Sequence, residues 1–330
     1  MIGFLPLVRN ETLKVWRKKR FWVIVALLVV LIPIFTYAQW KAAESFRKQS
    51  GTDDWRIRAE QQIHDFNNRI VSPRVPEEWK RTLRVEVQRL EYHLEHGIDP
   101  SAPSGVTFAR EFAENAVGLF LPLMVMVIGA DLVSSEQAQG TIKLLLTRPV
   151  RRWKVLASKY AALTLYVTLT VVAAAALAYA ISGAAFGYSG WRVPVLVGFQ
   201  VSAAGVDTTH VHAVEQWQYL LMTLGLVWFS CMTVAALSLM ISVLVRSTAA
   251  GMGILLALLI AGSILANMAS SWEHAKYFFM VNLNTVSYLA GQMPPIPGMT
   301  LPFSLAVLSA TALVSVAVSF AVFTNRDVMN

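Results

Sequence analysis

Charged residues are scarce in this chain, and their scarcity excludes most soluble proteins. Asp, Glu, Lys and Arg make up 15% of its 330 residues, whereas a soluble globular domain contains about 25%. Hydrophobic residues make up 55%, and the mean hydropathy is +0.52. Such a deficit of charge is expected when much of the surface faces lipid. We therefore expect a membrane protein.

Cysteine is also nearly absent, which excludes an intrachain disulfide. The single cysteine, Cys231, lies inside an apolar run. A free cysteine in that setting packs as a small hydrophobic residue. It gives no information about the redox compartment.

The sequence lacks the motifs that would give the chain its own chemistry. No G-x-x-x-x-G-K-[ST] loop for nucleotide phosphates and no H-E-x-x-H zinc motif occur in it. The pairs His93 with His96 and His210 with His212 could each bind a metal, but nothing supplies the remaining ligands. We therefore predict no catalytic residue, no metal site and no cofactor in this chain, and no enzyme activity of its own.

Six apolar segments approach the length of about 20 residues that a membrane-spanning helix needs. They are 21–38, 113–133, 160–186, 217–245, 248–270 and 301–323. The first is long and no small-residue cleavage site follows it, so it does not match a signal peptide. Within the six segments, only Glu114 and Asp131 are ionisable, whereas ion-driven transporters need buried ionisable groups. The sequence predicts an all-α, polytopic membrane protein without an ion relay.

Lys and Arg flank the predicted spans mainly on one side. Six precede the first span and six lie between the second and third: Arg9, Lys14, Arg17, Lys18, Lys19, Arg20, Lys143, Arg148, Arg151, Arg152, Lys154 and Lys159. The positive-inside rule then places both termini, the 134–159 segment and the 324–330 tail in the cytoplasm. Segments 187–216 and 271–300 face outward. We expect a multi-pass protein of the cell membrane, whose net charge of +8 meets lipid headgroups rather than nucleic acid.

Two further segments show helical periodicity. Residues 1–20 combine apolar side chains with a basic remainder, which predicts an interfacial helix in the headgroup plane. A frayed basic leader is the alternative. In 39–112, two stretches with apolar residues at helical spacing are separated by "SPRVP", and Gly97 offers a helix stop. This insert is predicted to be an extracellular helical hairpin.

The connection "SSEQAQGTIKLLLTRPVRRWKVLASKY", residues 134–160, differs from the apolar runs on both sides. Gly140 allows another backbone to approach closely, and Leu144 with Leu145 gives an apolar surface too short to span lipid. Pro149 ends this helix. A short amphipathic helix of this kind fits a groove on a soluble partner. An ordinary positive-inside loop is the alternative.

The order of residues in this connection resembles a known family. Permease subunits of the second exporter class of ABC transporters carry, after their second span, a pattern E-x-x-x-G-T…L…P-x-x-R…K. The matching residues here are Glu136, Gly140, Thr141, Leu145, Pro149, Arg152 and Lys159. Six spans, cytoplasmic termini and a basic interfacial helix are also similar to that family. The large outer hairpin departs from its smallest members.

The resemblance implies a specific mechanism. Residues 136–149 would form a coupling helix, seated in a groove of a dimeric cytoplasmic ATPase subunit that binds ATP and Mg. A second permease subunit, identical or paralogous, would complete the pathway for an amphipathic or lipophilic cargo such as a peptide antibiotic, a drug or a lipid. The coupling residues would be Glu136, Gly140, Thr141, Leu144, Leu145, Arg148, Pro149 and Arg152. Whether Glu136 anchors the contact or pairs with an arginine of this subunit stays open.

The outward segment 271–300 is rich in aromatic residues. Tyr277, Phe278, Phe279 and Tyr288 fit an interface belt, or an outer gate built from re-entrant helices. A different function is also open: a membrane sensor whose outer hairpin binds a ligand.

Overall fold

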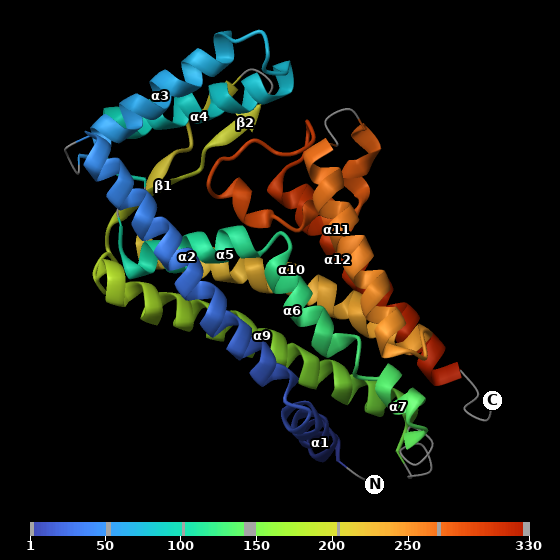
Figure 1. Cartoon of the computed structure of the whole chain (residues 1–330). Coiled ribbons are helices and arrows are strands. Elements are labelled where there is room, and N and C mark those ends of the chain that lie inside the picture. The colour runs from blue at the N-terminus through green and yellow to red at the C-terminus, as the bar shows by residue number, and fades with distance from the viewer. Residues whose placement is uncertain are drawn as a thin grey trace.

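The protein is mostly helical, as predicted. The computed structural model describes residues 3–50, 54–100, 103–141, 150–202, 205–268 and 272–325 (Figure 1). Its α-helices are α1 (Phe4–Arg17), α2 (Arg20–Ser50), α3 (Trp55–Val71), α4 (Glu77–His96), α5 (Gly105–Ala116), α6 (Phe120–Gly129), α7 (Ser134–Ala138), α9 (Arg152–Phe186), α10 (Gln216–Leu244), α11 (Thr248–Met268) and α12 (Leu301–Asn325).

Six helical segments in the described residues are long and apolar enough to cross a membrane, which confirms the predicted number. They are Arg20–Phe46, Phe120–Ala138, Arg152–Phe186, Gln216–Leu244, Thr248–Ala266 and Leu301–Asn325. Their largest shared core lies among α2, α5, α6, α9 and α10. A second core joins α6 and α10 to α11 and α12.

The second predicted span, 113–133, is not one helix. Helix α5 ends at Ala116 and α6 begins at Phe120. Gly118 lies in the break, where its backbone freedom disfavours a continuous helix. Pro122 follows in the first turn of α6, where its missing N–H is tolerated. The candidate span is therefore Phe120–Ala138, and α5 is a separate buried helix that packs against α9 and α10.

The expectation of an all-α chain is wrong for segment 187–216. Strand β1 (Pro194–Val197) pairs antiparallel with β4 (His212–Glu215), and β2 (Gln200–Ser202) pairs with β3 (Gly205–Asp207). Valines recur in these strands, and β-branched residues favour extended backbone. The strands have three or four residues each, too few for a periodic pattern to reveal.

Helices α3 and α4 lie side by side, and with the strands they form one end of the molecule (Figure 1). A backbone amide of β3, Val206 N, donates to Gln88 Oε1 of α4 at 3.0 Å. Helix α1 and the C-terminal end of α12 lie at the opposite end, close to α7 (Figure 1). Segment 272–300 contains three short 3-10 helices, η2 (Glu273–Tyr277), η3 (Phe279–Asn282) and η4 (Thr285–Tyr288).

Candidate functional site

Helices α1, α7 and the start of α9 lie at the same end of the molecule (Figure 1), and seven charged side chains gather there. They come from α1, the start of α2, the segment from α6 to α7, and α9. We call them the buried ionic cluster: Glu11, Lys14, Lys18, Arg20, Asp131, Glu136 and Lys159.

Lys159 of α9 is the centre of this cluster. Its side chain is 0% exposed, and its Nζ lies 2.8 Å from Glu11 Oε2 and 2.8 Å from Glu136 Oε2. The same Nζ donates to the Leu132 carbonyl oxygen at 2.9 Å. A lysine ammonium has three N–H donors. Two of the three oxygens accept hydrogen bonds from it, and Glu136 Oε2 lies at ion-pair distance, so two carboxylates offset the buried charge.

Lys14 of α1 makes a second bridge between the same two carboxylates. Its Nζ lies 2.6 Å from Glu11 Oε1 and 2.7 Å from Glu136 Oε1. Partial burial acts to lower the pKa of Lys14, but the two carboxylates outweigh it and hold that pKa above the usual 10.5. The Lys14 ammonium is therefore charged at every physiological pH.

Asp131, between α6 and α7, forms the other half of the cluster. Its Oδ2 lies 2.7 Å from Lys18 Nζ, and its Oδ1 lies 2.7 Å from Arg20 Nη2. Lys18 also donates to Ser135 Oγ at 2.7 Å, and Arg20 to the Val127 carbonyl oxygen at 2.9 Å. A cavity of about 20 Å³ beside these residues has room for about one water molecule.

The cluster connects helices α1, α7 and α9 through buried ion pairs. Breaking a buried ion pair on one side costs several kcal/mol, because the other charge stays buried and uncompensated. The ion pairs therefore resist separation of α1, α7 and α9, and a hydrogen bond of 2.8 Å from Tyr166 Oη to the Thr12 carbonyl oxygen adds to the connection between α1 and α9. In the described part of the chain, no three His, Cys, Asp or Glu side chains are grouped to hold a metal ion.

The predicted coupling residues fall partly on this cluster. Glu136 pairs inside the chain, with Lys14 and Lys159 rather than with an arginine. Gly140 follows with a φ of 69°, and a Cβ there would meet none of the described residues within 4 Å. Thr141 is exposed, and its Oγ1 donates to the Glu136 carbonyl oxygen at 3.4 Å. These three residues therefore lead from the cluster to the surface.

The remaining coupling residues are placed only in part. Arg152 begins α9, and its Nη1 donates to the Thr324 carbonyl oxygen of α12 at 3.2 Å. Leu144, Leu145, Arg148 and Pro149 lie outside the described residues.

The four outer aromatic residues do not form one group among the described residues. Tyr277 and Phe278 are 59% and 41% exposed. Phe279 packs on the core shared by α6, α10, α11 and α12, whereas Tyr288 packs on a smaller cluster and its Oη lies 2.9 Å from Ser304 Oγ. The structure therefore gives no single constriction made of all four side chains.

The sequence predictions name Lys159 but place it in the connection before the predicted third span, 160–186. In the structure Lys159 is buried inside α9, which already begins at Arg152. The sequence predictions do not single out Glu11, the remaining member of the cluster. Glu11 is the single acidic residue among the first twenty, and an isolated carboxylate in a basic amphipathic helix was the signal available.

Comparison with known proteins places the chain in a family. Residues 82–329 match the family model described as "Protein of unknown function (DUF2705)". The chain belongs to this family. The matched region runs from α4 to the end of α12 and beyond, and includes Asp131, Glu136 and Lys159.

Two proteins of Bacillus subtilis (strain 168) are similar to the chain. One has the name "Uncharacterized protein YhcI" and is 26% identical over 335 residues, which cover 99% of this chain and 100% of the relative. The other has the name "Uncharacterized membrane protein YdbK" and is 29% identical over 218 residues, which cover 64% of this chain and 80% of the relative.

Proposed function

We propose that this chain is the membrane-spanning permease subunit of an ATP-driven exporter of the second ABC exporter class. It couples to a separate ATPase subunit through segment 136–149. The observation that carries the proposal is the position of Glu136. This carboxylate is locked between α1 and α9, four residues before the Gly140–Thr141 pair at the surface.

The buried ionic cluster supports transmission of force. Segment 142–149 connects α7 to α9, and both of these helices contribute a residue to the cluster. A displacement of this segment acts on Glu136 at one end and on Lys159 at the other, so α1, α7 and α9 shift as one body. A chain without a nucleotide loop needs such a connection to use energy from another subunit.

The placement in the membrane follows the same proposal. Six apolar helices and a relative named as a membrane protein support a multi-pass protein. In α1, Leu5 and Trp16 are 80% and 47% exposed whereas Val15 is buried, which supports a helix lying in the headgroup plane. The basic α1 and α7 end then faces the cytoplasm, and α3 with α4 stands outside the cell membrane.

The pathway would lie between two permease subunits, identical or paralogous. Helices α11 and α12 leave much of their apolar surface uncovered: Leu313 of α12 is 70% exposed and Ile264 of α11 is 55% exposed. Such surface suits lipid or a second subunit. An amphipathic or lipophilic cargo fits spans that contain so few charges outside the cluster.

The first test is the partner itself. A tagged chain, purified in mild detergent from its native cells, should bring down a protein with a P-loop, and the purified pair should hydrolyse ATP. Uphill export by the chain reconstituted without any ATPase, or repeated purification without a P-loop protein, contradicts the proposal.

The second test uses Gly140. A φ of 69° is disfavoured for most side chains but tolerated by Asn, and no described residue lies within 4 Å of a Cβ built at this position. Gly140→Trp should abolish ATP-coupled export while membrane insertion stays normal, because the indole blocks a close partner. Gly140→Asn is the matched control and should keep at least half of the activity. Full coupling in the Trp variant would show that no partner docks there.

A further inference from the structure

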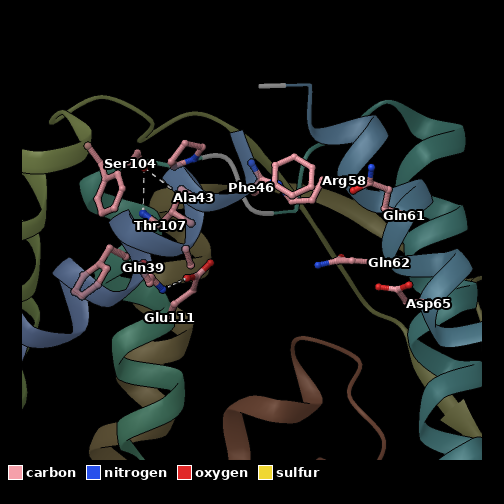
Figure 2. Close-up of a pocket in the computed structure, with 14 residues that line it drawn as sticks. Gln39, Ala43, Phe46, Arg58, Gln61, Gln62, Asp65, Ser104, Thr107 and Glu111 are labelled. Atoms are coloured by element: carbon pink, nitrogen blue, oxygen red, sulfur yellow. Dashed lines mark hydrogen bonds between the residues drawn. The ribbon is translucent and has the colours of Figure 1, made fainter. Parts of the chain in front are cut away.

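A large cavity separates the α3 and α4 pair from the membrane-spanning helices. Its volume is about 470 Å³, within the range of sites for small ligands. Figure 2 shows its two walls: α3 on one side, and α2 with α5 on the other. The α3 wall presents Arg58, Gln61, Gln62 and Asp65, and the facing wall presents Gln39, Phe46, Ser104, Thr107 and Glu111.

The α3 wall carries one positive and one negative group. The Arg58 guanidinium lies 4.8 Å from the centroid of the Phe46 ring, and its Nε is buried without a hydrogen-bond partner among the described residues. Asp65 follows two helical turns later, and Figure 2 shows it directed into the gap with Gln62. Opposite charges on one wall suit a ligand that is itself zwitterionic.

The facing wall adds a second carboxylate and an amide. Glu111 Oε2 accepts a hydrogen bond of 2.8 Å from Gln39 Nε2, and Glu111 Oε1 lies 3.4 Å from Arg110 Nη2. Glutamine amides both donate and accept. The cavity therefore offers a guanidinium for a phosphate, carboxylates for an ammonium, and amides for the ester oxygens between them.

Aromatic residues fix the level of this cavity relative to the bilayer. Tyr37 and Trp40 of α2 are 60% and 44% exposed, and their rings stack at 6.2 Å. Exposed Tyr and Trp at the end of a spanning helix mark the membrane surface. Phe46 stands only six residues beyond Trp40, about 9 Å along the helix. The cavity therefore lies at the height of the lipid headgroups.

A separate apolar groove lies along the same helix α2, on the side of the cavity nearer to the start of that helix. It has a volume of about 250 Å³ between α2 and α9, and is lined by Pro33, Thr36, Tyr37, Trp40, Ile181 and Ala185. Phe186, the next residue after Ala185, lines the polar cavity. A molecule with a polar head and an apolar tail can occupy both sites at once.

We infer that this cavity binds the headgroup of a zwitterionic phospholipid with a primary ammonium, of the ethanolamine type, and that the groove between α2 and α9 holds one acyl chain. Arg58 binds the phosphate, and Asp65 accepts hydrogen bonds from the ammonium. A choline headgroup has no N–H to donate, and a glycerol headgroup has no positive charge. The site therefore selects ethanolamine lipids, independently of the proposed ATPase coupling.

The experiment uses the full chain in nanodiscs of phosphatidylcholine, without any ATPase. A phosphatidylethanolamine with a diazirine in one acyl chain is added and photoactivated, and mass spectrometry locates the adducts. We expect adducts on α2 and α9 at the groove, and at least tenfold stronger competition by unlabelled phosphatidylethanolamine than by phosphatidylcholine or phosphatidylglycerol.

Matched variants in α3 separate the two charges. Arg58→Gln should reduce labelling about tenfold, and Asp65→Asn should remove the preference for ethanolamine over choline. Arg69→Gln and Glu60→Gln alter exposed residues of the same helix that do not line the cavity, and should label like the wild type. Circular dichroism checks the helix content of each protein.

Three results would overturn the inference. The first is equal competition by phosphatidylcholine, and the second is labelling of Asp65→Asn with its preference intact. The third is displacement of the probe by soluble glycerophosphoethanolamine at the same concentration as the lipid, which would assign the cavity to a soluble ligand. None of these results depends on ATP hydrolysis, so the inference can fail while the proposed function stands.

Discussion

The positive charge of a fully buried lysine has to be offset by nearby oxygen atoms, and the surroundings of Lys159 provide them. Two carboxylates and one carbonyl oxygen surround its ammonium. Lys14 joins the same two carboxylates from the opposite helix. At the scale of single residues, two lysines that lie far from Glu136 in the sequence therefore hold its carboxylate in place.

Removing the Lys159 charge should destabilise the fold. Lys159→Met leaves Glu11 and Glu136 buried with Lys14 alone, and we expect the free energy of unfolding to fall by about 3 kcal/mol. The measurement is the unfolding midpoint of the purified chain in detergent. Lys154→Met, in the same helix, is the control because Lys154 is only half-buried and lies over the Trp153 ring. Equal midpoints for the two variants would show that the cluster adds no stability.

His93 of α4 predicts a pH dependence at the other end of the molecule. Burial lowers its pKa to about 4 from 6.5, and its Nδ1 lies 3.1 Å from the Ile98 carbonyl oxygen. Between pH 6.5 and about pH 4, the His93 imidazole is protonated in the unfolded state but neutral in the folded state. The free energy of unfolding therefore falls as the pH falls through this window. The opening equilibrium of α4, which is the hydrogen-exchange rate divided by the intrinsic rate at the same pH, should therefore be larger at pH 5 than at pH 7.5.

The magnitude of that effect can be isolated with a variant. We expect opening of α4 to increase roughly tenfold at pH 5 after correction for intrinsic exchange. His93→Gln should abolish the increase. His64→Gln, which changes an exposed histidine of α3, should retain it.

At the scale of elements, small residues set how closely the helices approach. A Cβ at Gly105 of α5 would lie 2.9 Å from Gly183 Cα of α9, and the Gly105 N–H donates to the Gly187 carbonyl oxygen at 2.9 Å. Close approach through glycine is the usual means of packing helices in membranes, where no hydrophobic driving force brings them together.

Gly129 provides the test of this packing. A Cβ at Gly129 of α6 would collide with the side chain of Ser238 in α10. Gly129→Ala should therefore lower the free energy of unfolding by about 1–3 kcal/mol, seen as a lower midpoint in detergent. A Cβ at Gly225 of α10 meets no atom of the described residues within 4 Å, so Gly225→Ala should be neutral or slightly stabilising. A midpoint unchanged in both variants would contradict the close packing.

At the scale of the whole molecule, the two ends of the chain's bundle differ in charge and in structure. The end at α1 and α7 contains the cluster, and the other end contains α3, α4 and the strands (Figure 1). We expect the first end in the cytoplasm and the second outside, because the basic residues of the short connections gather at the first.

Single cysteines test this orientation. Asn10 of α1 is polar and exposed, and Val71 of α3 is 82% exposed, so each accepts a cysteine at the surface. In a Cys231→Ala background, a membrane-impermeant maleimide should label Val71→Cys in intact cells, and Asn10→Cys only after permeabilisation. The reverse pattern would invert the topology and remove the basis for a cytoplasmic coupling segment.

Hydrophobicity along the chain was sufficient to predict six spans and a helical fold, because each span satisfies its own backbone hydrogen bonds within one local segment. Hydrophobicity could not predict the helix break at Gly118, because packing decides whether a glycine interrupts a helix. The short strands in 187–216 depend on partners that lie up to 21 residues apart, Pro194 with Glu215, and no local pattern reveals such pairing.

The sequence by itself determined that this chain is mostly apolar helix, that it lacks a nucleotide loop, and which charges surround the connection after the second span. Only the tertiary structure decided that Glu11, Glu136 and Lys159 meet, and that Arg58 and Asp65 share a wall with a groove below it. The physical reason is that composition and periodicity act over one helix, whereas a buried ion pair or a cavity exists only between helices that packing brings together.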